Sequence, residues 1–220
     1  RILKKYNLNL KNNLLFREKR FMTELEENQK EMIYVLTELM EANSDETGRH
    51  IRRVAEYSRL LAHYHPSITE EDAQVIFHAA PMHDIGKIAI PHEILHKPGR
   101  LTEEEFTIMK THTTRAHDVL KISDRKFIKA AEVIAMQHHE KWNGTGYPQG
   151  LAREEIHIYA RIVAIADVFD ALTHKRVYKD AWSTEEAVEY IIQHKNTQFD
   201  PVLVDLFEEH VDEFIAISHF

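Results

Sequence analysis

The 220-residue chain has no cysteine, only six glycines and six prolines, and no long apolar run. Without cysteine it can form neither a disulfide nor the thiolate site of structural zinc. No run approaches the roughly 20 apolar residues of a membrane span, and no signal-peptide pattern opens the chain. The scarcity of glycine and proline leaves few helix breakers. These absences predict a soluble, helical chain and are compatible with the cytoplasm.

The net charge is −8, which argues against a general nucleic-acid binder, so we expect no DNA partner. A small nucleotide can still bind a local basic pocket. Apolar residues recur at helical spacing over long stretches, whereas strand-like alternation is scarce. The sequence therefore predicts an all-α fold, with one domain over residues 41–220 and a helical segment over residues 1–40.

Residues 1–40 read as one polar helix with a coiled-coil seam. The chain begins at Arg1 rather than methionine, so the segment resembles a linker from a missing N-terminal sensor. Glu18 and Gln29 interrupt the seam, which leaves a single helix packed on its own domain as the alternative. We favour a parallel homodimer, whose a and d positions would be Leu15, Met22, Leu25, Met32, Leu36 and Leu39.

Against this background, six potential metal ligands follow one another along the chain: His83, Asp84, His112, His138, His139 and Asp167. Imidazole with carboxylate favours iron, manganese or zinc. His83-Asp84 and Asp167 lie in apolar stretches, where an ionised carboxylate needs a partner. The alternative is that these are ordinary surface histidines. That alternative fits the isolated histidines elsewhere in the chain better than it fits this set. Two neighbouring metals can activate water and clamp a phosphoryl group, so phosphodiester hydrolysis is the leading chemistry.

The spacing of these residues suggests how two metals would share them. On a helix, adjacent residues project about 100 degrees apart, so His83-Asp84 and His138-His139 can each serve two ions. Asp84 can then bridge the ions. Lys87 follows one turn later, where its ammonium can stabilise charge on the phosphate or the leaving oxygen, and we assign Lys87 and Asp84 catalytic roles.

Local signals predict the elements around these ligands. Thr102 and Glu105 form a capping-box pattern at the start of a helix that delivers His112. The punctuated stretch from Ile85 to Arg100 predicts a loop with short turns. Asp200 and Pro201 are expected to cap and begin the last helix.

Taken together, the motifs resemble the HD-GYP family of metal-dependent phosphohydrolases. His83 to Lys87 match its HD signature, His138 to Pro148 match its second signature, and further matches extend the resemblance over residues 41 to 205. The resemblance implies an all-helical HD-type bundle with two or three divalent metal ions, for which iron or manganese is preferred. It also implies hydrolysis of the bacterial second messenger cyclic di-GMP to pGpG, with GMP as the alternative end product. Such a domain is expected to be the output of a signalling protein with an upstream sensor or receiver domain.

The resemblance adds residues to the predicted site. Glu46 and His50, four residues apart on one helical face, match a family pair that contributes metal ligands, and Glu46 goes with a third metal. Asp170, three residues after Asp167, is expected to orient a ligand or a metal-bound water.

A loop and a basic segment are the expected substrate contacts. Residues 143–150 hold three of the six glycines and follow the His-His doublet, so the loop is expected to shape the mouth of the site. Tyr147 offers an aromatic face or a hydroxyl, and Gly146 and Pro148 flank it. Arg176 and Lys179, on either side of Tyr178, match the family segment that grips phosphates.

Two other functions remain alternatives. A catalytically silent receptor would bind a cyclic dinucleotide and relay its occupancy through the N-terminal helix. A diiron oxygenase is the second, since the HD scaffold also supports oxygen chemistry, but Lys87 and the segment from Arg176 to Lys179 favour phosphate. Related substrates such as 3',3'-cyclic GMP-AMP stay open.

Overall fold

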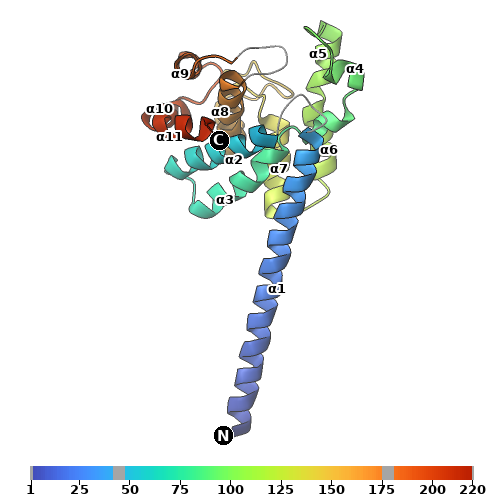
Figure 1. Ribbon diagram of the computed structural model, residues 1–220, viewed down its shortest axis with the longest axis vertical. Helices are drawn as coiled ribbons and strands as arrows, with labels where there is room; N and C mark the ends of the chain where they lie inside the picture. The colour runs from blue at the N-terminus through green and yellow to red at the C-terminus, as the bar shows by residue number, and fades with distance from the viewer. Residues whose placement is uncertain (1, 42–47, 175–180, 220) are drawn as a thin grey trace. The chain divides into compact units, whose positions relative to one another are not determined.

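The computed structural model describes residues 2–41, 48–174 and 181–219, which form helices joined by turns (Figure 1). Within these ranges the only β pairing is two isolated bridges, so the predicted all-α fold is confirmed. The elements are α1 (Ile2–Glu41), α2 (Gly48–Tyr64), α3 (Glu70–Ala79), η1 (Ala80–Met82), η2 (Ile85–Ala89), α4 (His92–Leu95), α5 (Glu103–Lys110), α6 (His112–Leu120), α7 (Lys126–Gln137), η3 (Arg153–Glu155), α8 (Ile158–Thr173), α9 (Thr184–Gln193), α10 (Pro201–Glu209) and α11 (Val211–Ser218), where η denotes a 3-10 helix.

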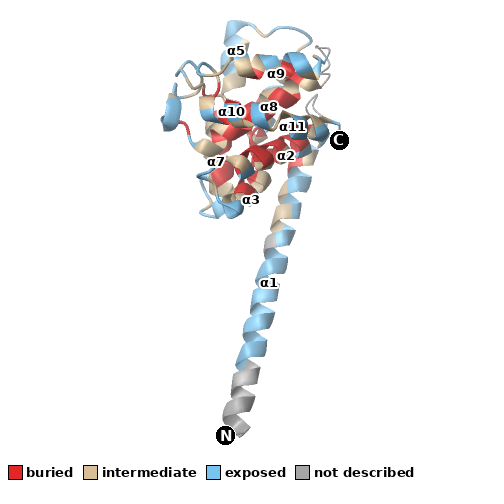
Figure 2. Ribbon diagram, turned by 90° about the vertical axis from the view of Figure 1, so that its left-hand side faces the viewer, coloured by how far each residue is buried: buried red, intermediate tan, exposed pale blue. Residues whose placement is uncertain are grey.

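The chain divides into two compact units, Arg1–Leu36 and Thr37–Phe220. The predicted N-terminal helix is present as α1, and most of its described side chains are exposed (Figure 2). All six predicted seam residues, from Leu15 to Leu39, are among the exposed large apolar side chains. None of the helices within the described ranges has the length and apolar character needed to cross a membrane.

The core of the second unit lies where α2 packs against α3 and α8, and α7 against α3, α6 and α8 (Figure 1). Tyr57 of α2 is fully buried and meets Phe169 of α8 edge-on at 5.3 Å and Phe214 of α11 stacked at 5.6 Å, measured between ring centroids. Half of α8 is buried, which follows from its nearly continuous apolar sequence. This burial fixes the helix that carries Asp167 and Asp170.

The capping signals are confirmed. The hydroxyl of Thr102 accepts the Glu105 N–H, and the Glu105 side chain accepts the Thr102 N–H, so α5 begins with a capping box. Asp200 caps α10 by accepting the Val202 N–H, and Pro201 is its first residue. One expectation was wrong: α10 is followed by α11, so it is not the last helix.

The two ligand doublets do not lie inside helices, contrary to prediction. His83 and Asp84 form a turn between η1 and η2, and His138 and His139 follow the end of α7. His112 is likewise the first residue of α6, after α5 ends, rather than a residue of the helix that Thr102 caps. Ligands at helix ends can project from several directions towards one point, which side chains along one helix cannot do.

Candidate metal centre

The structure gathers seven of the eight predicted metal ligands into two groups. Within each group, one ligand atom per residue lies within 4.8 Å of the others. We call Asp84, His112, His138 and His139 cluster A, and His50, His83 and Asp167 cluster B. The eighth residue, Glu46, lies outside the described residues, as do Arg176 and Lys179.

Asp84 lies between the clusters. Its Oδ1 atom is 3.2 Å from Nε2 of His112 and 3.7 Å from Nε2 of His138, both in cluster A. Its Oδ2 atom is 3.2 Å from Nε2 of His83 in cluster B. With one oxygen towards each group, Asp84 would supply a ligand atom to a metal ion held by either cluster.

Backbone carbonyls orient the imidazoles. Nδ1 of His83 lies 2.9 Å from the Ala80 carbonyl oxygen, and Nδ1 of His112 lies 2.8 Å from that of Met109. Nδ1 of His138 lies 3.1 Å from the Ile134 oxygen. A ring that donates from Nδ1 keeps its Nε2 lone pair available, and in each case Nε2 is the atom turned towards the cluster.

Three buried atoms of cluster A have the character of ligands for a cation. Nε2 of His112, Nε2 of His138 and Oδ1 of Asp84 are buried without a hydrogen-bond partner among the residues that the structure describes. Buried polar atoms without partners are costly, and a metal ion would satisfy all three. The nitrogen and oxygen donor set fits a divalent transition metal.

The electrostatics keep these residues ready to bind a cation. Burial lowers the pKa of His138 and His139, and proximity to His138 lowers that of His139 further, so both imidazoles stay neutral. Burial alone would raise the pKa of Asp84, but the Lys87 ammonium and the imidazoles of His83, His112 and His138 together hold it well below its usual range. Asp84 is therefore ionised.

Lys87 makes a close ion pair within the site. Its Nζ atom is 2.6 Å from Oδ2 of Asp84, and about a fifth (21%) of its side chain is exposed. The ammonium thus lies at the edge of the centre, next to the carboxylate that faces both clusters.

Sequence reasoning missed Arg53, which contacts cluster B indirectly, through Asp170. Oδ2 of Asp170 lies 2.8 Å from Nδ1 of His50, and the same carboxylate accepts from Nε and Nη2 of Arg53 at 2.6 and 3.0 Å. Nε2 of His50 then faces Asp167 at 3.7 Å. Asp170 thus contacts a predicted ligand directly. The only sequence signal for Arg53 is its place one helical turn after His50.

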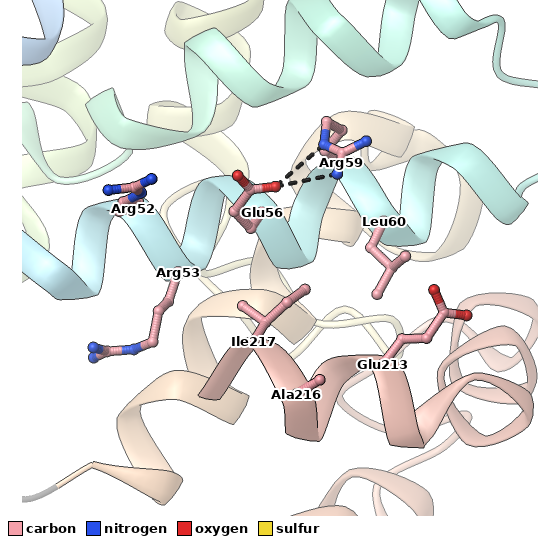
Figure 3. A pocket seen from close by; sticks show the side chains of 8 residues that line it. All are labelled: Arg52, Arg53, Glu56, Arg59, Leu60, Glu213, Ala216 and Ile217. Atoms are coloured by element: carbon pink, nitrogen blue, oxygen red, sulfur yellow. Dashed lines mark hydrogen bonds and ion pairs between the residues drawn. The ribbon is translucent and has the colours of Figure 1, made fainter. Parts of the chain in front are cut away.

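Arg53 also borders a cavity of about 410 Å³ between α2 and α11, where it points away from Glu56 and Arg59 (Figure 3). Arg59 donates to Glu56 at 3.2 Å, and Arg53 is held by Asp170. No residue of cluster A or cluster B lines this cavity. Its charges are largely neutralised within the protein, and we assign it no substrate.

Gly86 allows the turn at His83-Asp84 to approach α6. A Cβ atom at this position would lie 1.9 Å from the backbone oxygen of His112, which cannot move without shifting that ligand. Close packing against α6 is therefore a sufficient reason for a glycine at this position.

The loop over residues 143–150 is held against the doublet that precedes it. Tyr147 stacks on His139 with 4.7 Å between ring centroids. Gly146 approaches the backbone so closely that a Cβ atom would lie 2.4 Å from the Lys141 nitrogen. The Tyr147-Pro148 peptide bond is cis. The loop thus borders cluster A through Tyr147, and Gly146 packs against the backbone of Lys141.

Glu140 is a second residue that sequence reasoning passed over. Its buried carboxylate accepts the N–H groups of Gln149 at 2.7 Å and Leu151 at 3.1 Å, which closes the loop back onto the His-His doublet. The acceptor lies nine and eleven residues from its donors, a distance at which no helical or turn pattern signals the contact.

Glu140→Ala is expected to lower the free energy of unfolding by about 2 kcal/mol, because hydrogen bonds to a charged group contribute roughly 1.5–3 kcal/mol. Glu140→Gln retains one acceptor and should lose about half as much. Thermal unfolding and limited proteolysis within residues 143–150 measure the effect. Glu154→Ala, an exposed neighbour on η3, is the control, and equal behaviour of the two alanine variants would contradict the role of Glu140.

The fold and the two clusters define an all-helical domain that binds divalent metal ions. The HD domain family model matches residues 10–203, and the chain belongs to this family. This family match, together with the relatives and solved structures described next, confirms the resemblance to the HD-GYP proteins.

Curated relatives share this region. The chain is 48% identical over 204 residues to 3'3'-cGAMP-specific phosphodiesterase 2 of Vibrio cholerae serotype O1, covering 93% of this chain and 39% of that protein. It is 42% identical to a cyclic di-GMP phosphodiesterase of Thermotoga maritima, covering 92% of this chain and 55% of that one. It is also 42% identical to the cyclic di-GMP phosphodiesterase response regulator RpfG of Xanthomonas campestris pv. campestris, covering 84% of this chain and 48% of that protein. The chain thus spans about two fifths to just over half of these relatives.

Solved structures agree on the fold. A cyclic GMP-AMP specific phosphodiesterase of V. cholerae superimposes with a TM-score of 0.61 at 21% identity, covering 85% of this chain and 50% of that one. An HDG"Y"P protein of Bdellovibrio bacteriovorus superimposes with a TM-score of 0.56 at 22% identity, covering 74% of this chain and 51% of that chain. The HD-type helical bundle is therefore confirmed.

Proposed function

We propose that this domain is a metal-dependent phosphodiesterase that hydrolyses cyclic di-GMP to pGpG, with GMP as the alternative end product. The observation that carries the proposal is the position of Asp84, with Oδ1 towards His112 and Oδ2 towards His83. The names of the relatives support the class of substrate. The cyclic GMP-AMP names among them make 3',3'-cyclic GMP-AMP the second substrate to test.

Divalent ions held by clusters A and B would activate water and neutralise the charge of the phosphate. The two clusters support two ions, and from the family resemblance we propose iron or manganese for them. Glu46 would serve a third ion. Lys87, at the edge of the centre, would stabilise charge on a phosphate oxygen, and Tyr147 would contact the substrate. We retain Arg176, Lys179, Gly146 and Pro148 as proposed substrate contacts.

The first experiment is anaerobic purification with metal analysis, followed by chromatography of the products from cyclic di-GMP after iron, manganese or zinc is supplied. We expect release of pGpG or GMP at a rate that falls on chelation and returns on addition of metal. Bound metal with intact dinucleotide would select the receptor. Metal-dependent oxygen uptake on a small polyol or phosphonate without phosphodiester cleavage would select the oxygenase.

We further propose that the domain is the cytoplasmic output of a longer signalling protein, in which α1 joins it to a sensor or receiver domain and pairs in a parallel coiled coil. The exposed seam supports pairing because its apolar side chains gain from burial against a second copy. Light scattering measures the molar mass of the protein in solution and so distinguishes a monomer from a dimer. Leu25→Glu should yield the monomer if the seam is the interface, and an unchanged dimer would refute it.

A further inference from the structure

Helix α5 brings a partly exposed aromatic side chain next to the centre. Phe106 is 46% exposed, and its ring centroid lies 6.1 Å from that of Tyr147, with the rings nearly perpendicular at 83°. Tyr147 in turn stacks on His139 of cluster A. A continuous row of rings therefore leads from a candidate metal ligand to the protein surface.

A cation accompanies this aromatic ring. Lys110 follows Phe106 by one helical turn, and its Nζ atom lies 5.4 Å from the ring centroid. Aromatic faces hold nucleobases by stacking, and neighbouring cations hold the phosphates between them. The pair thus has the chemistry of a nucleotide contact.

The position of α5 is tied to the metal ligands. The capping box of Thr102 and Glu105 fixes its first turn, and the Met109 carbonyl in its last turn is 2.8 Å from Nδ1 of His112. Phe106 is therefore held in a defined relation to cluster A. This fixed relation favours a binding role over that of a freely moving surface side chain.

We propose that Phe106, together with Tyr147 and Lys110, holds one purine base of the cyclic dinucleotide and that Lys110 contacts the phosphate next to it. This inference rests on the proposed function of the adjoining centre. A cyclic dinucleotide carries two bases beyond its reacting phosphate, so a phosphodiester at the clusters needs a surface of this kind for the base that extends outward. An exposed ring also gains from being covered by a base.

The test compares cyclic di-GMP with bis(p-nitrophenyl) phosphate, a small phosphodiester without purine or ribose, on the manganese-loaded protein. Phe106→Ala is expected to raise KM for cyclic di-GMP about tenfold, because base stacking on an aromatic ring contributes a factor of this order. Its effect on kcat, and on bis(p-nitrophenyl) phosphate, should be at least fivefold smaller. Phe106→Trp should restore KM. Lys110→Gln should raise KM about threefold and make it less sensitive to salt.

Ile108→Ala is the matched control, since Ile108 is 37% exposed on the same helix and its side chain has no aromatic ring to stack on a base. Equal KM values in Phe106→Ala and wild type would overturn the proposal. If Phe106→Ala lost activity equally with both substrates and also lost metal, the proposal would be overturned too, because that result indicates a structural role for Phe106. If the wild type hydrolyses no cyclic dinucleotide, equilibrium binding replaces kinetics. A tenfold weaker affinity in Phe106→Ala would then support the base site while the proposed hydrolysis fails, and no binding by the wild type would refute both.

Discussion

Asp84→Ala is expected to remove bound metal from both clusters and to lower the rate of cyclic di-GMP hydrolysis by more than about a thousandfold. Loss of a single transition-state hydrogen-bond donor already costs enzymes about 100- to 1,000-fold, and Asp84 is proposed to contact two ions. The substitution also leaves Lys87 without the carboxylate that lies 2.6 Å from its ammonium. Metal analysis and product chromatography under anaerobic conditions measure both effects.

Asp200→Asn is the matched control for Asp84→Ala. Asp200 is also a buried aspartate in an ion pair, with its Oδ2 atom 2.5 Å from Nη1 of Arg161, but it belongs to neither cluster. Its loss should lower the unfolding temperature and leave metal content per folded protein unchanged. If Asp84→Ala kept its metal and its rate, or if Asp200→Asn lost both, the assignment of the centre would be wrong.

The residues that the sequence could predict are those whose type and surroundings are themselves unusual. Asp84 and Asp167 stand in apolar stretches, and an ionised carboxylate there requires a partner. The capping pattern at Thr102 and the apolar periodicity of the helices are also local, so the start of α5 and the all-α class followed from them.

What the sequence could not predict depends on contacts between distant segments. Arg53 forms an ion pair with Asp170, 117 residues further along the chain, and no local sequence pattern near either residue predicts this contact. The spacing argument for two metals places His83-Asp84 on a helix. The structure instead brings Gly86 against the His112 backbone, and this packing is decided by α6, a separate element.

The second large effect is expected from Asp170→Asn, which should reduce metal affinity at cluster B by about 10- to 100-fold, the usual cost of losing the partner that orients a histidine ligand. The carboxylate holds Nδ1 of His50 and, at the same time, both guanidinium contacts of Arg53. Removing its charge leaves Arg53 buried without an anion. We therefore also expect a loss of about 3–5 kcal/mol in the free energy of unfolding.

The stability loss and the metal effect can be separated with a second substitution. In Asp170→Leu combined with Arg53→Met both charges are gone, and replacing a buried ion pair by apolar side chains is often neutral for stability. The double variant should regain much of the lost unfolding free energy, measured by denaturant titration. Its cluster B should still bind metal weakly, because the Asp170 oxygen that holds Nδ1 of His50 has been removed. Recovery of metal content together with stability would mean that Asp170 only neutralises Arg53; stable protein that still lacks metal at one cluster would identify Asp170 as the residue that positions His50.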